Sequence, residues 1–80
     1  MATVFFSSEL IKFTGEEQVE VKARDYRALI DELVTRFENL DKAQMMEMAI
    51  SIDGLILVDP LFEAIEEESE IHFFYFVTGG

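Results

Sequence analysis

The last eleven residues, 70–80, constrain this chain more than any other stretch. Between Ile71 and Val77 every position except His72 carries an apolar or aromatic side chain, and the sequence then closes with Gly79 and Gly80. Such residues favour a β-strand. Because the run shows no polar alternation, we expect both of its faces to be covered and the strand to lie centrally in a sheet. Since glycine neither packs nor holds one conformation, the run predicts a central strand followed by a thin, flexible tail.

Composition limits what the chain can do. Eighty residues, half of them apolar, suit one small domain rather than a disordered segment. Cysteine is absent, which excludes disulfides, a thiolate nucleophile and a cysteine metal site. A net charge of −11 argues against nucleic acid and anionic membranes as partners and favours a basic partner surface. With no signal-peptide pattern and no apolar run of about 18 residues, we expect a soluble cytoplasmic protein.

The first part of the chain predicts a hairpin followed by a helix. Residues 3–8 form an apolar strand, and residues 9–17 read as a loop around Gly15. Residues 18–24 alternate between apolar and polar side chains, as an edge strand does. Asp25 is placed to cap the next helix. One apolar stripe at helical spacing follows it, and Asn39 is the expected end. The stripe consists of Tyr26, Leu29, Ile30, Leu33, Val34 and Phe37.

The second part predicts another hairpin and a short plug of the core. Residues 49–52 and 55–58 are apolar strands joined by Asp53-Gly54, a strong signal for a tight hairpin turn. Leu61, Phe62 and Ile65 are expected in a short turn of helix beneath the core. An acidic turn over residues 66–70 then leads into the last strand.

These elements predict an α+β domain over residues 1–80. One main helix packs on one face of a mixed sheet of four to five strands, and the tail comprises residues 78–80. The first and last strands are the most apolar, so we expect them to lie side by side in the middle of the sheet and to run parallel.

The element order, with a glycine tail on a central strand, resembles the ubiquitin-like β-grasp fold, and more closely the MoaD/ThiS sulfur carriers. Within that family it is most similar to the small subunit of molybdopterin synthase. The likeness rests on residues 4–6 with Glu9, Leu10 and Gly15, and on residues 70–74 and 77–80. The chain departs from the family pattern at Glu68-Ser69, where a Gly-Asp turn is usual, and at Tyr75-Phe76, where two prolines are usual. Asp53 stands where the family commonly has asparagine.

The resemblance implies a carrier rather than an enzyme. A ubiquitin-activating-like enzyme would use ATP to adenylate the carboxylate of Gly80, and a sulfur donor would convert it to a thiocarboxylate. The sulfur would pass to the large subunit of molybdopterin synthase or to another acceptor, as in thiamine synthesis. Thr78, Gly79 and Gly80 can extend about 10 Å, and the two glycines fit a narrow channel. We expect no bound cofactor or metal, only the transient adenylate or thiocarboxylate.

Two other interpretations stay open. A ubiquitin-like modifier would be activated in the same way but conjugated through Gly80 to lysines. Alternatively, the glycines are incidental and the domain only binds partners.

A partner would also need a docking surface. If Ile71 and Phe73 face the helix, strand alternation puts His72, Phe74 and Phe76 on the opposite face. We expect Phe6, on the neighbouring strand, and Ile56, near the edge, to join them in an exposed patch.

Overall fold

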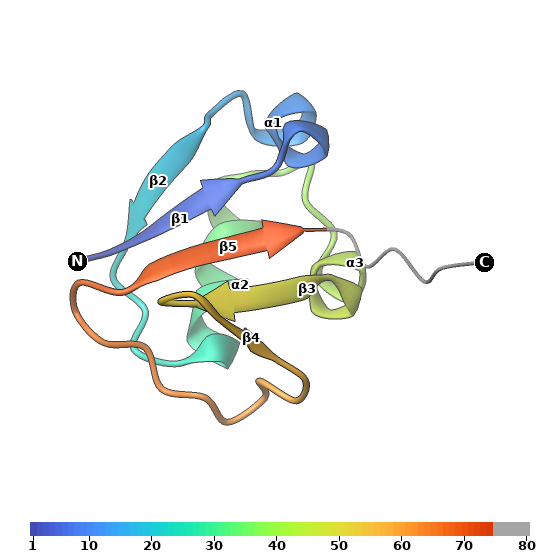
Figure 1. Cartoon of the computed structure of the whole chain (residues 1–80). Coiled ribbons are helices and arrows are strands. Elements are labelled where there is room, and N and C mark those ends of the chain that lie inside the picture. Colours follow the sequence, from blue (N-terminus) through green and yellow to red (C-terminus); the bar gives the residue numbers. More distant parts are fainter. Residues whose placement is uncertain (75–80) are drawn as a thin grey trace.

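The computed structural model describes residues 1–74, and its five strands form one mixed sheet in the order β2-β1-β5-β3-β4. Helix α2 packs behind the sheet in the view of Figure 1, while α1 and α3 lie toward its right-hand end. The strands are β1 (Ala2–Phe6), β2 (Gln18–Val21), β3 (Ala49–Ile52), β4 (Leu55–Leu57) and β5 (Glu70–Phe74), and the helices are α1 (Ser8–Thr14), α2 (Tyr26–Arg36) and α3 (Lys42–Glu47).

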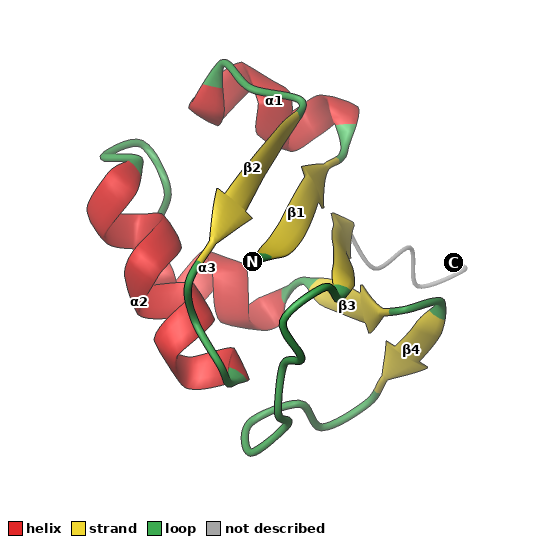
Figure 2. Ribbon diagram, turned by 90° about the vertical axis from the view of Figure 1, so that its left-hand side faces the viewer, coloured by secondary structure: helices red, strands yellow, loops and turns green. Residues whose placement is uncertain are grey.

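Strand β5 is the centre of the sheet, as predicted. It runs parallel to β1, with Val4 beside Ile71, and antiparallel to β3 on its other side. The expectation that both of its faces are covered is wrong. Ile71 and Phe73 are fully buried against the helices, whereas Glu70 and His72 are exposed. The end-on view in Figure 2 shows why, because α2 and α3 lie to one side of the strands and none of the described helices covers the other side.

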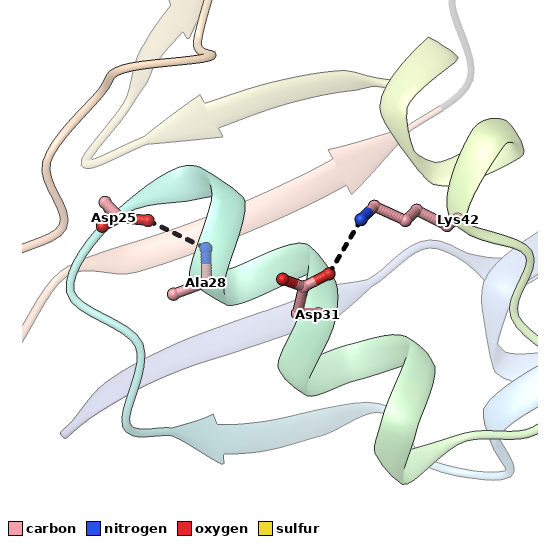
Figure 3. Close-up of polar contacts among 4 residues, drawn as sticks. All are labelled: Asp25, Ala28, Asp31 and Lys42. Atoms are coloured by element: carbon pink, nitrogen blue, oxygen red, sulfur yellow. Dashed lines mark hydrogen bonds and ion pairs between the residues drawn. The ribbon is translucent and has the colours of Figure 1, made fainter.

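Helix α2 forms as its apolar stripe predicts. The side chain of Asp25 accepts a hydrogen bond of 2.8 Å from the N–H of Ala28, which caps the helix (Figure 3). Tyr26, Leu29, Ile30 and Leu33 are buried in the core. The helix ends earlier than expected, since Phe37 rather than Asn39 leaves the helical conformation.

The exposed, charged face of α2 forms an ion pair with a neighbouring helix. Asp31 forms an ion pair of 3.0 Å with Lys42 at the start of α3, as Figure 3 shows. Both side chains are largely exposed, so this pair contributes little to stability. Its effect is to join α2 to α3 on the helical side of the domain.

The segment expected as a loop over residues 9–17 contains α1. This helix buries Leu10 and ends at Gly15, whose positive φ of 74° lets its N–H donate to the carbonyl of Ile11 at 2.7 Å. No side chain caps its first turn, because Ser7 makes no capping hydrogen bond. Seven residues without a cap give only a weak helical pattern, and the prediction missed it for that reason.

The Asp53-Gly54 turn joins β3 to β4 as predicted. Both residues have positive φ, 52° and 85°, which is the geometry of a type I′ turn. The Asp53 carboxylate also accepts a hydrogen bond of 2.8 Å from the N–H of Glu70, and the Asp53 N–H donates to the Glu70 carbonyl. The turn therefore fixes where β5 begins.

The predicted helical plug over residues 61–65 is not a helix. Ile65 alone fills the core there, whereas Phe62 is 83% exposed. The backbone instead runs beside the start of α2: the Tyr26 N–H donates to the Glu63 carbonyl, and the Ile65 N–H donates to the Arg24 carbonyl. Extended pairing with residues 24–26 thus replaces the expected turn of helix.

Candidate partner-binding face and C-terminal tail

Within residues 1–74, no helix covers one face of the sheet, and this face is turned toward the viewer in Figure 1. The strand register brings Phe5, His72, Ser51 and Ile56 into one row across β1, β5, β3 and β4. Phe5 and His72 stack with their ring centroids 4.7 Å apart and their planes 11° from parallel. The aromatic rings of Phe5 and His72 therefore pack against each other on this face.

Two apolar residues extend this row. Ile56 is 58% exposed at the β4 end, and half-buried Phe74 lies beside Ala49 at the far end of β5. We call Phe5, Ile56, His72 and Phe74 the open-face patch. Ile56, His72 and Phe74 were predicted on this face, and the structure brings them together. Apolar side chains gathered on an uncovered sheet face are typical of an interaction site.

Phe6 does not belong to this patch, so its predicted exposure is wrong. Its side chain is 7% exposed and meets Phe37 of the helical side edge-to-face, with 5.8 Å between ring centroids. Phe6 pairs with buried Phe73, whereas Phe5 pairs with His72. Phe5 is the residue that the sequence interpretation missed. The signal that could have identified Phe5 is strand alternation: if Val4 is buried, the next residue, Phe5, must lie on the opposite face of the sheet.

The tail residues fall beyond the part of the chain that the structure describes. Phe76, Thr78, Gly79 and Gly80, all predicted as functional, lie outside residues 1–74. The described portion of β5 lies between β1 and β3 and ends at Phe74, which pairs with Ala49 of β3, one residue beyond the last pair with β1.

Charge is distributed unevenly between the two halves of the chain. All six Lys and Arg residues occur in residues 1–42, and the residues from 43 onward include eight acids and no Lys or Arg. On the open face, Glu20 and Glu70 lie on either side of Thr3. None of the strand residues that the described part places on this face is Lys or Arg, so the face is acidic as well as apolar.

The described residues offer few other functional groups. Within residues 1–74, no group of three or more His, Asp or Glu side chains is arranged to hold a metal ion. None of the helices described is long and apolar enough to cross a membrane. Burial raises the pKa of the Tyr26 hydroxyl, which lies in the core rather than in a site. The open-face patch and the tail therefore remain the candidate functional features.

The fold is a ubiquitin-like β-grasp: a mixed five-stranded sheet with parallel β1 and β5 at its centre, crossed on one face by α2. The solved structure of SAMP1 from Haloferax volcanii has the same fold, with a TM-score of 0.74. The match covers 99% of this chain and 98% of that chain at 19% sequence identity. No protein-family model matches the chain, and no curated protein matches its sequence.

Proposed function

We propose that the protein is a carrier whose C-terminal glycine carboxylate is activated by a partner enzyme. The observation that carries the proposal is the ubiquitin-like fold, whose central strand β5 continues in sequence to Thr78-Gly79-Gly80. A carboxylate is a poor acyl donor because its oxygen is a poor leaving group. Attack of the Gly80 carboxylate on the α-phosphorus of ATP would release pyrophosphate and give an acyl-adenylate.

In the proposed sulfur-carrier pathway, a donor that supplies sulfide then displaces AMP and leaves a thiocarboxylate. The protein would be a substrate of the adenylating enzyme rather than an enzyme, with no cofactor of its own. The acceptor proposed from the sequence resemblance is the large subunit of molybdopterin synthase, in the cytoplasm. The four residues of the open-face patch are proposed to dock the activating enzyme.

A ubiquitin-like modifier is the second candidate, favoured by the ubiquitin-like fold that the chain shares with the structure of SAMP1. Activation would be identical up to the adenylate. The Gly80 acyl group would then pass to a lysine amine of another protein and form an isopeptide bond. The two candidates differ only in the nucleophile that takes the acyl group.

Activation is tested by ATP–pyrophosphate exchange with the adenylating enzyme of the host. We expect deletion of Gly80 to abolish exchange and to change the melting temperature little. Gly80→Ala is the matched variant, because it keeps the length and the carboxylate but adds a Cβ that a narrow channel would reject. Exchange that survives the deletion at the full rate would refute the carrier proposal.

Intact mass spectrometry of the protein from its own host then separates the candidates. Replacement of one carboxylate oxygen by sulfur at Gly80 supports the sulfur carrier. After digestion of the other host proteins, a C-terminal remnant of this chain joined to their lysines by an isopeptide bond supports the modifier. A host protein whose C-terminal residue is not Gly80 would contradict both.

A further inference from the structure

The two edges of the sheet are treated differently by the rest of the chain. At β2, side chains of α2 occupy the outward backbone groups. The Glu32 carboxylate accepts hydrogen bonds of 3.0 to 3.1 Å from the N–H groups of Lys22 and Ala23, and Arg36 donates at 2.9 Å to the Glu20 carbonyl. An arriving strand would have to displace these bonds, so the β2 edge is protected against pairing.

Strand β4 forms the opposite edge and has no such cover. The two-residue turn that precedes β4 is flanked by Ile52 and Leu55, which form a hydrogen-bonded pair. Because such pairs alternate with non-hydrogen-bonded ones along an antiparallel ladder, the next pair, Ser51–Ile56, exchanges no backbone hydrogen bonds. The N–H and C=O of Ile56 therefore face away from β3. Among the described residues, no side chain or backbone group outside the sheet bonds to them. This edge is available for a further strand.

The side chains along this edge are apolar and exposed. Leu55 is 66% exposed, Ile56 58% and Val58 99%. A groove of about 240 Å³ lies beside Ile56 and Val58, and Met46, Met48 and Pro60 contribute to its wall. An exposed apolar edge without a blocking charge is rare, because it invites pairing with another chain.

Charge indicates which chain would pair there. Residues 54–58 are uncharged, but Asp53 and Asp59 flank them, and Glu47 lines the groove. A second copy paired antiparallel about Ile56 would set Asp53 opposite Asp59 twice and bring together two molecules of net charge −11. Like charges directly opposite destabilise a strand pair. A strand with an apolar centre and basic ends would match the edge instead.

We propose that the free edge of β4 binds an extended peptide segment of a partner protein, apolar at its centre and flanked by Lys or Arg, by β-strand addition. Backbone hydrogen bonds to Ile56 supply affinity, and alternate apolar side chains of the segment enter the groove. The flanking cations meet Asp53 and Asp59. Ile56 belongs both to this edge and to the open-face patch, but binding of the segment needs neither ATP nor the tail and is therefore measured apart from the activation of Gly80.

The probe is a synthetic nonapeptide with acetylated and amidated ends, Lys-Lys-Val-Thr-Val-Thr-Val-Lys-Lys, and its match with all four Lys replaced by Glu. Binding to the full chain is followed by calorimetry and by amide chemical shifts. We expect the Lys-flanked peptide to shift the amides of residues 54–58. We expect the Glu-flanked peptide to bind at least about tenfold more weakly at low salt. Equal binding of the two peptides would overturn the assignment of a basic partner.

Ile56→Pro removes the outward N–H without touching the β3–β4 ladder, and Ile56→Val keeps that group. With folding checked by circular dichroism, the Pro variant should bind the Lys-flanked peptide at least about tenfold more weakly, and the Val variant within about twofold. Val58→Ser, at a fully exposed position, should weaken binding without a folding cost, and Phe62→Ser outside the edge should not. Equal affinities of the Pro and Val variants would overturn the proposal. So would self-association in sedimentation that Ile56→Pro abolishes, because the occupant would then be a second copy.

Discussion

Alanine substitution of Phe5 and of Phe6 should have opposite effects, although the two residues are adjacent. Phe6 is buried and packs edge-to-face on Phe37, so Phe6→Ala should cost about 3–5 kcal/mol. Phe5 is half-buried, and its principal contact is the stack on His72, so Phe5→Ala should cost less than about 1.5 kcal/mol. A domain of 80 residues has a total stability of about 4–12 kcal/mol, so only the first change threatens the fold.

Urea unfolding followed by circular dichroism measures the difference. With an m-value of about 1.5 kcal/mol/M, Phe6→Ala should lower the midpoint by about 2–3 M and Phe5→Ala by less than about 1 M. For binding to the adenylating enzyme, the order of the two variants should be reversed. If the patch docks the enzyme, Phe5→Ala should cost more than about 2 kcal/mol of binding free energy. A larger midpoint shift for Phe5 than for Phe6 would refute the register of β1.

Three further changes test other parts of the fold. Leu33→Ala should cost about 2–5 kcal/mol in denaturant unfolding, because its side chain is fully buried, and a neutral result would contradict the packing of α2. Glu32→Ala leaves two backbone N–H groups without their acceptor and should cost about 1–2 kcal/mol, with faster amide exchange at Lys22, whereas Glu32→Gln should cost less. The raised pKa of Tyr26 means that the unfolded chain loses the hydroxyl proton first. This contribution to stability is therefore complete below about pH 10 and declines as pH rises toward the folded pKa. Tyr26→Phe should flatten that decline in thermal melts between about pH 8 and 11, and an unchanged slope would contradict it.

The sequence was sufficient to predict an element where the residues of one short segment determine its backbone conformation. Helix α2 has an Asp25 cap and an apolar stripe, and each is a signal within one segment. The Asp53-Gly54 turn needs positive φ at both positions, which these residues tolerate. The central, parallel placement of β1 and β5 followed from their apolar content.

The sequence was insufficient where two arrangements differ by one residue. Phe5 and Phe6 are the same amino acid, so alternation alone does not say which of them faces the helices. The pairing of Phe6 with Phe73 decides it, and that pairing is a long-range property of the sheet. The same holds for residues 59–65, because Pro60 cannot continue the strand, but the path that follows is set by pairing with residues 24–26.

The register also explains why the patch and the tail would be used together. Phe74 is the last residue described in β5 and belongs to the open-face patch, so the patch reaches the point from which the chain continues toward Gly80. An enzyme that covers the patch gains binding energy that is the same before and during the reaction, and such uniform binding is felt in KM. Gly80 carries the reacting carboxylate, so a change at Gly80 should lower kcat. Patch variants should therefore raise KM for adenylation and leave kcat near its original value, whereas Gly80→Ala should lower kcat. A patch variant that lowered kcat alone would show that the face acts on the chemical step rather than on docking.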